Sequence, residues 1–332
     1  MSEPPRLRLS LSNVAGGRLT DGGGHHEYAD ADRTDVFAQA LSARRPDLVV
    51  LSELDCGPGS TQIDRLSAGA FGTPDVHKHQ EPWSESHVPG VRSLGLGIAS
   101  RFPLRDIQRV DLPAPSFPLL SWDGKEGRPK RLPWHAKGLL IARCATPGGD
   151  VCIVAAHLHP IHIARSPGPE GVPYSYDVGA GLEFGQRTAR IIGKRLAALG
   201  DVPVILAGDM NMPDPRGLFT HLGGVALADA FGPGEPPATT PDGRSIDRAF
   251  VSGHLTPLAH RVVPVPGADH FVVAFEMEYG RGRATRPPAL ARTLGETPGM
   301  STASLEAGRQ HAPVSRRPGV SSPSDRPHPR RM

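Results

Sequence analysis

The stretch Val202-Pro203-Val204-Ile205-Leu206-Ala207-Gly208-Asp209-Met210-Asn211 is an apolar run that ends in a glycine, a carboxylate and an amide. A continuous Val/Ile/Leu run indicates a strand covered on both faces, and side chains two apart on a strand point the same way. The stretch therefore predicts a buried strand that delivers Asp209 and Asn211 to one site. Gly208 allows a turn or a close approach of another group. An Asx turn capping the strand would leave the same pattern, so other parts of the chain must decide.

Polar residues stand at the ends of further apolar runs, spread over most of the chain. Each of these runs predicts a short strand, and each polar residue lies at a strand tip. Strand tips that meet at one edge would place the polar side chains in one site. The runs are residues 7–13, 47–53, 95–103, 151–158, 245–251 and 267–273.

These motifs, in this order, resemble those of the endonuclease/exonuclease/phosphatase superfamily over roughly residues 6–278. The resemblance implies an α/β fold, namely a four-layer α/β/β/α sandwich of two packed mixed sheets with outer helices. It also implies hydrolysis of phosphoester bonds. The residue pattern alone also fits a doubly wound single sheet.

Two segments have the apolar periodicity of amphipathic helices and are predicted as outer helices, residues 35–45 and 184–199. Two other segments, 55–91 and 160–181, are interpreted as long insertions that shape access to the site. His77, His79 and His87 in the first insertion have mixed spacing and no cysteine partner. Surface histidines are therefore favoured over a zinc cluster.

Composition predicts one catalytic domain, residues 1–280, followed by a tail. Residues 281–332 are rich in proline, serine and arginine, with ten arginines against three acidic residues, whereas residues 1–280 carry a net charge of −4. A segment with few large apolar residues cannot offset its ordering entropy, so we expect the tail to be disordered. It is either an arm for nucleic acid or acidic membrane lipid, or a solvated extension. We infer no obligate protein partner.

Cysteine usage and the N-terminal residues indicate a cytoplasmic protein. Cys56, Cys144 and Cys152 are too few for a disulfide framework and are expected to be reduced core thiols, although the last two flank a predicted hairpin turn. The first ten residues lack the apolar segment of a signal peptide, and no run reaches transmembrane length.

Hydrolysis of a phosphoester requires a positioned water and positive charge against the phosphoryl oxygens. Mg²⁺, or Mn²⁺, supplies that charge and prefers oxygen ligands. The resemblance assigns Glu53 as the main metal ligand, with Asp269 as a second, and places Asn13 beside them on the metal shell or phosphate. Many nuclease members have an acidic residue two positions after this asparagine, where this chain has Ala15. That departure favours a one-metal site.

The remaining motifs predict the catalytic half of the site. A carboxylate such as Asp247 fixes the tautomer of an imidazole such as His270, which can then act on the water. Asp209 competes with His270 as the group that activates water, and the sequence leaves this open. By the same resemblance, Asn211 and His157 donate hydrogen bonds to phosphoryl oxygens.

Substrate class is less constrained by the sequence. Residues 134–139, WHAKGL, resemble the Lys-Gly strand opening of sphingomyelinase-like and inositol-phosphatase members. This resemblance favours a small or lipid-like phosphodiester or phosphate as the substrate. It also makes Lys137 a candidate contact to the phosphate. A surface lysine at a strand start is the alternative. A nuclease of the same fold and a catalytically silent binding protein are the other functional hypotheses. Arg248, where many members have an aromatic residue, leaves the subgroup open.

Overall fold

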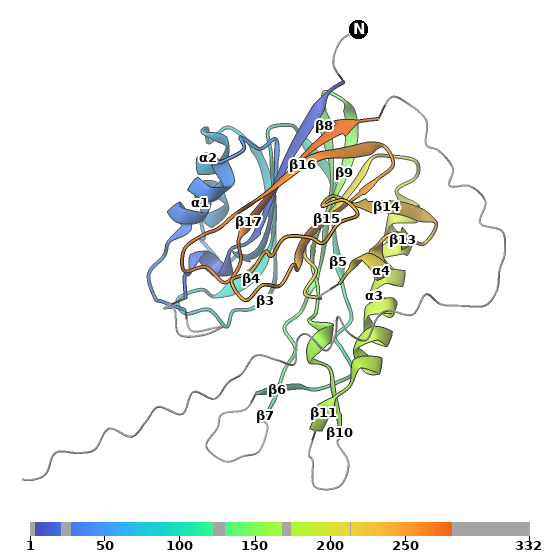
Figure 1. Cartoon of the computed structure of the whole chain (residues 1–332). Coiled ribbons are helices and arrows are strands. Elements are labelled where there is room, and N and C mark those ends of the chain that lie inside the picture. The colour runs from blue at the N-terminus through green and yellow to red at the C-terminus, as the bar shows by residue number, and fades with distance from the viewer. Residues whose placement is uncertain (1–3, 21–27, 122–129, 168–173, 213, 281–332) are drawn as a thin grey trace, which may run out of the picture. The chain divides into compact units, whose positions relative to one another are not determined.

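Two β-sheets pack face to face in the computed structural model, which describes residues 4–20, 28–121, 130–167, 174–212 and 214–280 (Figure 1). The first sheet has six strands in the order β16-β17-β1-β2-β4-β3. Its strands β1 and β2 are parallel and the other neighbours are antiparallel. Its elements are β1 Arg6–Asn13, β2 Leu48–Asp55, β3 His77–Glu85, β4 Ser93–Ser100, β16 Leu255–Val263 and β17 Val272–Tyr279.

The second sheet has seven strands in the order β13-β14-β15-β12-β9-β8-β5. Its central pair, β9 and β12, is parallel, so both strands end at the same edge. The predicted strand around residue 205 is β12, and its end at Asp209 confirms the prediction. The elements are β5 Leu104–Asp111, β8 Gly138–Thr146, β9 Gly149–His157, β12 Val204–Asp209, β13 His221–Leu222, β14 Val225–Asp229 and β15 Asp247–Ser252.

Helices cover the outer face of each sheet, as Figure 1 shows. On the first sheet these are α1 Thr34–Ser42 and α2 Gln62–Phe71, and on the second α3 Val178–Ala198 and α4 Arg216–Phe219. Two single 3₁₀ turns, η1 Ala15–Gly17 and η2 Ile161–Ile163, follow strands at the site edge. Two small hairpins extend from the second sheet's connections, β6 Leu119–Ser121 with β7 Lys130–Leu132, and β10 Arg165–Pro167 with β11 Tyr174–Tyr176.

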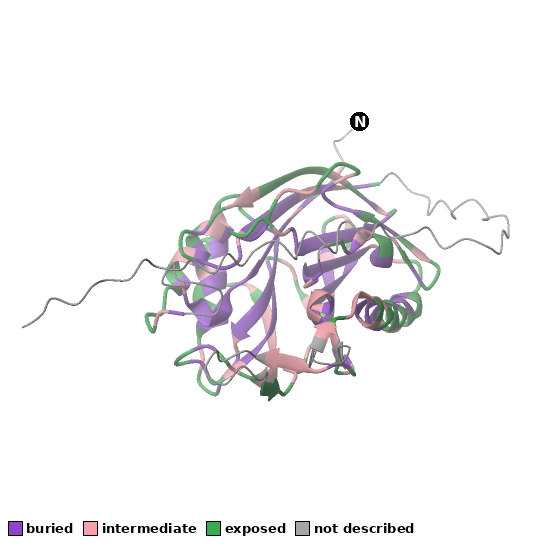
Figure 2. Cartoon of the chain, turned by 60° about the horizontal axis from the view of Figure 1, so that its bottom comes forward, coloured by how far each residue is buried: buried purple, intermediate pink, exposed green. Residues whose placement is uncertain are grey.

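Strand alternation divides the core into three apolar layers. Leu48 and Val50 of β2 point into the layer between the sheets, whereas Val49 and Leu51 of the same strand pack beneath α1 and α2. A third layer lies between the second sheet and α3. In Figure 2 the central strands and the inner sides of the helices are buried, whereas the outer sides of the helices and edge strands such as β16 are largely exposed. Burial on both faces explains the continuous apolar runs and confirms the four-layer sandwich.

The interpretation of residues 55–91 as an insertion is wrong. This segment contains α2, which packs on α1, and β3, the edge strand of the first sheet. The sequence of β3, HKHQEPWSE, has almost no apolar residue because none of its side chains is fully buried. Edge strands are often polar in this way, and a polar strand lacks the pattern that identifies strands.

The second predicted insertion, 160–181, contains η2 and the β10–β11 hairpin, as an excursion from the core. It ends earlier than predicted because α3 begins at Val178, where the Asp177 side chain accepts a hydrogen bond from the backbone N–H of Ala180. Residues 281–332, predicted to form a disordered tail, lie outside the described residues.

The three cysteines are buried free thiols, as predicted. Cys144 lies in the layer between the sheets and Cys152 in the layer beneath α3, so they face opposite sides of their hairpin. Burial raises the pKa of Cys144 and of Cys152 to about 11. Within the described ranges, no helix has the length and apolarity needed to span a bilayer.

Candidate active site

Strand ends bring the predicted polar side chains to one edge of the sandwich. His157 ends β9, Asp209 ends β12 and Asp247 begins β15, and the strand register places Asp209 directly between the other two. Asn13 ends β1 in the facing sheet. Because Asn13 donates from Nδ2 to Oδ2 of Asp209 at 3.2 Å, the site lies where the two sheets meet.

Gly208 lets β12 approach β9 closely just before the site. Its φ is +140°, and a Cβ atom at this position would lie 2.0 Å from the carbonyl oxygen of Ala156. The sequence predicted either a turn or a close approach here, and the structure shows a close approach in an unusual backbone conformation. Any other residue would displace Asp209.

Asp209 is 1% exposed and lies at the centre of the site. Its Oδ1 accepts from the backbone N–H of Asn211 at 2.9 Å. Its Oδ2 lies 3.4 Å from Nε2 of His157 and 3.9 Å from Nε2 of His270. Burial, together with the negative charges of Asp247 and Glu53, raises the pKa of Asp209 to about 6 against the opposing charge of His270.

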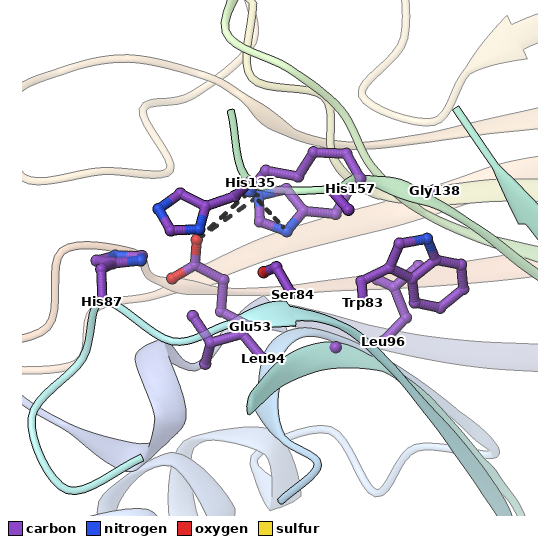
Figure 3. A pocket seen from close by; sticks show the side chains of 12 residues that line it. Glu53, Trp83, Ser84, His87, Leu94, Leu96, His135, Gly138 and His157 are labelled. Atoms are coloured by element: carbon purple, nitrogen blue, oxygen red, sulfur yellow. Dashed lines mark hydrogen bonds and ion pairs between the residues drawn. The ribbon is translucent and has the colours of Figure 1, made fainter. Parts of the chain in front are cut away.

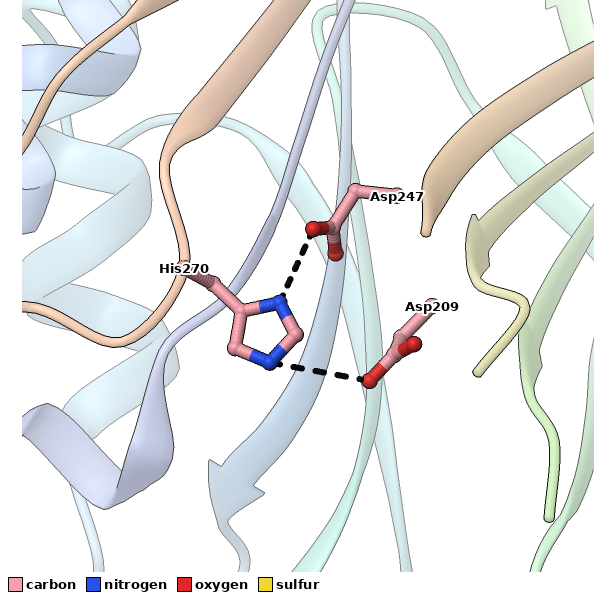
Figure 4. Close-up of side chains that lie close together, drawn as sticks. All are labelled: Asp209, Asp247 and His270. Atoms are coloured by element: carbon pink, nitrogen blue, oxygen red, sulfur yellow. Dashed lines mark hydrogen bonds and ion pairs between the residues drawn. The ribbon is translucent and has the colours of Figure 1, made fainter. Parts of the chain in front are cut away.

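His270 and Asp247 form a hydrogen-bonded pair, shown in Figure 4. His270 Nδ1 lies 2.8 Å from Asp247 Oδ2, and the opposite ring nitrogen faces Asp209. Burial opposes the imidazolium, but the charge and hydrogen bond of Asp247 prevail and raise the pKa of His270 to about 10. The hydroxyl of Thr239 accepts from the backbone N–H of Asp247 and fixes the start of β15.

On the other side of Asp209, Lys137 reaches into the site beside His157. Its Nζ lies 2.5 Å from His157 Nε2 and 3.7 Å from Glu53 Oε1. Burial lowers the pKa of Lys137, while Glu53 and Asp209 oppose that shift. Burial and the charge of Lys137 hold the pKa of His157 well below its usual value. His157 is therefore a neutral imidazole at neutral pH.

Two of the site residues have left-handed backbone conformations. Glu53 has φ 49° and lies at a bulge where β2 slips against β4, and Asn211 has φ 52° just after β12. Such conformations cost about 1–3 kcal/mol in non-glycine residues and concentrate at functional sites. The bulge at Glu53 was not predicted, because the sequence places this residue at the end of a strand that in fact continues to Asp55.

Asn211 bridges the two strands of the site. Its Nδ2 donates to the carbonyl oxygen of Leu158 at 3.0 Å and lies 3.3 Å from Nε2 of His157. Asn13 is held similarly, since its Oδ1 accepts from the backbone N–H of Ala15. Ala15, two residues after Asn13, thus provides a backbone donor to the Asn13 side chain.

Asp269, the predicted second metal ligand, lies just before β17 and is bound by a residue that the sequence did not single out. The hydroxyl of Tyr28 donates to Asp269 Oδ2 at 2.6 Å. Burial and the charges of Asp269 and Glu53 raise the pKa of Tyr28, which keeps that hydroxyl protonated. Asp269 Oδ1 is buried and has no hydrogen-bond partner among the described residues.

The donor atoms near this edge fit a hard divalent cation. An unpaired buried carboxylate oxygen such as Asp269 Oδ1 is unfavourable unless it meets a cation or water. The ligand atoms of Asp209, Asp247 and His270 also lie within 4.8 Å of one another. However, the hydrogen bond between Asp247 and His270 already uses one atom of each. Asp247 Oδ1, like Asp269 Oδ1, still has no hydrogen-bond partner among the described residues, so Asp247, Asp269 and Glu53 each offer an oxygen to a metal.

Several residues of the site edge were missed by sequence reasoning. The ring of His87 lies 6.1 Å from that of Tyr28 and 5.1 Å from that of His135. Nε2 of buried His159 lies 3.2 Å from the carbonyl oxygen of His135. These residues lie in irregular segments without strand or helix periodicity. The one signal in the sequence is that His135 lies two positions before Lys137, a predicted site residue. His77, His79 and His87 form no group with metal-ligand spacing within the described part of the chain, and His79 pairs with Glu81.

Comparison with known protein families gives a match that spans the predicted site residues. The model of the Endonuclease/Exonuclease/phosphatase family matches residues 12–270, which begins one residue before Asn13 and ends at His270. No curated protein sequence matches the chain.

Solved structures share the fold. An endonuclease/exonuclease/phosphatase from Beutenbergia cavernae is 24% identical, with a TM-score of 0.58 over 83% of this chain and 72% of that one. The human Nocturnin catalytic domain, solved with a bound sulfate anion, is 18% identical, with a TM-score of 0.55 over 83% of this chain and 94% of that one. A mannosyl-6-phosphatase from Bacteroides thetaiotaomicron is 16% identical, with a TM-score of 0.52 over 82% of this chain and 100% of that one.

Proposed function

Because the chain belongs to the endonuclease/exonuclease/phosphatase family, we propose that it is a divalent-metal-dependent hydrolase of phosphoester bonds, acting on a small or lipid-like substrate. The observation that carries this proposal is the position of Asp209. Its buried carboxylate has the His270–Asp247 pair on one side and the nitrogens of His157 and Asn211 on the other. A binding protein has no use for such a costly buried arrangement.

The nitrogens beside Asp209 are suited to bind a phosphoryl group. Lys137 brings an ammonium group, and Asn211 an amide donor, close to Nε2 of His157. Negative charge on the phosphoryl oxygens increases the strength of these contacts in the transition state. We assign Lys137, His157 and Asn211 to phosphoryl binding, with Asn13 holding Asp209 in place.

A water for the attack would lie on the other side of Asp209. Oδ2 of Asp209 and Nε2 of His270 face each other across 3.9 Å, so a water beside them contacts both groups. Asp247 keeps the ring of His270 in the orientation that this requires. Asp209 accepts the proton of this water, while the imidazolium of His270 orients the water and favours the ionised form of Asp209.

Glu53 and the unpartnered Oδ1 of Asp269 would hold Mg²⁺ or Mn²⁺, which supplies positive charge to the phosphoryl and leaving oxygens when bound. The oxygen-only donor set supports this choice of metal. Since Ala15 offers no carboxylate, one ion fits better than two.

Charge favours a small substrate over a long nucleic acid. Residues 1–280 carry a net charge of −4, and tight binding to DNA relies on many lysine and arginine contacts to phosphates. A nuclease is the second candidate, because residues 281–332 carry an excess of arginine that could provide such contacts. The domain boundary at residue 280 is part of the same proposal.

A parallel assay tests both candidates. Purified protein is incubated with Mg²⁺ and, separately, bis-p-nitrophenyl phosphate, sphingomyelin and plasmid DNA, and each assay is repeated with excess EDTA and with Asp209→Ala. We expect turnover of the first or second substrate that both controls abolish. Cleavage of DNA alone would favour the nuclease, and the absence of any turnover would favour a silent binding protein.

A further inference from the structure

A pocket opens beside the phosphoryl-binding residues, between the β3–β4 hairpin and the segment that precedes β8 (Figure 3). We call it the Trp83 pocket. Glu53, Lys137 and His157 lie at the end that it shares with the site. The rest of its wall includes Trp83, Ser84, His87, Leu94, Leu96 and His135.

The pocket lies on one side only of the proposed phosphoryl position. Asp209, Asp247 and His270 do not line it, whereas Lys137 and His157 do. In an in-line displacement the attacking and leaving oxygens are on opposite sides of the phosphorus. If the water is held beside Asp209 and His270, the leaving alcohol must depart towards the Trp83 pocket.

The wall is apolar on one side. Leu94 and Leu96 are 5% and 1% exposed, and they lie below Glu53 in Figure 3. The edge of the Trp83 indole packs on Gly138, where a Cβ atom would lie 2.2 Å from Nε1. That indole N–H is buried without a hydrogen-bond partner. Gly138 is thus required for Trp83 to take its place.

The opposite wall is polar. His87 and His135 face each other with ring centres 5.1 Å apart, and the Ser84 hydroxyl lies on the same side as Glu53 in Figure 3. Burial lowers the pKa of His135, which keeps it neutral. Neutral imidazole and hydroxyl groups both donate and accept hydrogen bonds, as alcohol hydroxyls require.

The charges of the lining residues limit which chemical groups the Trp83 pocket can bind. Lys137 is the one lysine or arginine among its lining residues, and Glu53 and His157 already contact its ammonium group. A second phosphate or a carboxylate in the pocket would face Glu53 and would meet no other lysine or arginine of the lining, because Arg109 stacks on the ring of Trp83 outside the lining and pairs with Asp111. Burying an unpaired charge is costly, whereas a neutral group carries no such penalty.

The pocket has a cavity volume of only about 20 Å³, so we propose that it receives the leaving oxygen and the part of the alcohol next to it, and that this part is uncharged and hydroxylated. The inference rests on the proposed function, since it requires a phosphoester. The oxygen of water forms a bond to phosphorus while the bond from phosphorus to the alcohol oxygen breaks. The alcohol oxygen keeps the electron pair and gains a proton from solvent, and the water's second proton stays on the phosphate.

The test measures inhibition, so it does not depend on which ester is turned over. Hydrolysis of bis-p-nitrophenyl phosphate is measured in the presence of three inhibitors, namely glycerol phosphate, phosphoglycerate and inorganic phosphate. The first two differ by one carboxylate, and the third has no alcohol. We expect the inhibition constant of glycerol phosphate to be about tenfold lower than those of the other two.

Trp83→Ala should remove the advantage of glycerol phosphate and leave inhibition by inorganic phosphate unchanged. Trp83→Phe, which keeps a ring, should retain the advantage. The matched control is His79→Ala, on the same strand but outside the pocket, which should behave as the unaltered chain. Thermal melting establishes that each variant is folded.

Equal inhibition by glycerol phosphate and phosphoglycerate would overturn the inference. So would an equal loss of inhibition by all three ligands in Trp83→Ala, because the pocket would then act on the phosphoryl group. If the unaltered chain hydrolyses no ester, the proposed function fails by itself. Calorimetric titration of the same three ligands then decides whether the pocket still discriminates as stated.

Discussion

Nδ1 of His270 lies 2.8 Å from Oδ2 of Asp247, and this contact turns the opposite ring nitrogen towards Asp209. The carboxylate thereby fixes the orientation of the ring and stabilises its imidazolium form, although it lies on a different strand from Asp209. Asp247 is fully buried, and it acts on the reaction through its hydrogen bond to His270 and through its charge beside Asp209.

We therefore predict that Asp247→Asn and His270→Ala each lower kcat by about a hundredfold or more. The double variant should lose little beyond the larger single loss, because the two residues act as a unit. Steady-state kinetics of the three variants at saturating metal provide the measurement. Losses that multiply in the double variant would show that the two residues act independently.

Replacing the carboxylate of Glu53 should weaken metal binding more than it destabilises the fold. Glu53→Gln keeps the size of the side chain but removes its charge, so we expect the Mg²⁺ or Mn²⁺ concentration for half-maximal activity to rise at least about tenfold. Calorimetric titration of Mn²⁺ provides a readout that does not need turnover. Glu81→Gln is the control, since Glu81 pairs with His79 outside the site. Unchanged metal affinity in Glu53→Gln would place the ion elsewhere, with Asp209 and Asp247 as the next candidates.

The fold could be predicted because both of its sheets are covered on both faces. Strands such as β9 and β12 are then continuous apolar runs, and each ends abruptly in a polar residue. The dependence of the apolar pattern on burial also explains why the segment containing β3 was wrongly interpreted as an insertion. β3 is an edge strand with no fully buried side chain, so its polar sequence resembled a loop.

The site could be predicted best where strands begin or end in it. Asn13, His157, Asp209 and Asp247 each lie at a strand end, and the structure brings them together. The partner of Asp269 could not be predicted, because Tyr28 comes from an irregular segment more than two hundred residues away, and only tertiary contacts place it there.

The tail can be removed to test the domain proposal. Deleting residues 281–332 should leave the melting temperature and small-substrate turnover unchanged, because every proposed site residue precedes position 271. If the arginines bind polyanions, affinity for DNA should fall, most strongly at low salt. Differential scanning fluorimetry and the bis-p-nitrophenyl phosphate assay are sufficient. A lower melting temperature would mean that the boundary at 280 is misplaced.

Gly208 should be intolerant of any side chain. Gly208→Ala places a Cβ atom 2.0 Å from the carbonyl oxygen of Ala156, in addition to the strain of a positive φ. Gly149→Ala is the matched control, because Gly149 has φ 111° and no atom within 4 Å of the added Cβ. We expect the control to lose about 1 kcal/mol of stability and full activity to remain. Gly208→Ala should lose more stability and most activity, as Asp209 is displaced. Equal effects in chemical denaturation would show that backbone strain alone matters at Gly208.

Acid should destabilise the fold through His159, a buried histidine held between aromatic rings. Its ring contacts those of Trp134 and Phe184 edge to face, and burial with the charge of Lys137 lowers its pKa from 6.5 to about 4. A histidine whose pKa is lowered by folding contributes stability that is complete above pH 6.5 and is lost as the pH falls towards 4. The shift corresponds to roughly 3 kcal/mol at most.

His159→Gln should therefore flatten the decline in unfolding free energy over this range, since glutamine does not titrate and its amide can still donate to the carbonyl of His135. His162, whose pKa burial also lowers to about 4, accounts for part of the slope that remains. Urea denaturation at intervals across the range measures the slope directly. The exposed His221, changed to glutamine, serves as the control and should leave the slope unaltered. A His159→Gln slope equal to that of the unaltered chain would mean that His159 is not kept neutral by its burial, and that the acid sensitivity of the fold arises elsewhere.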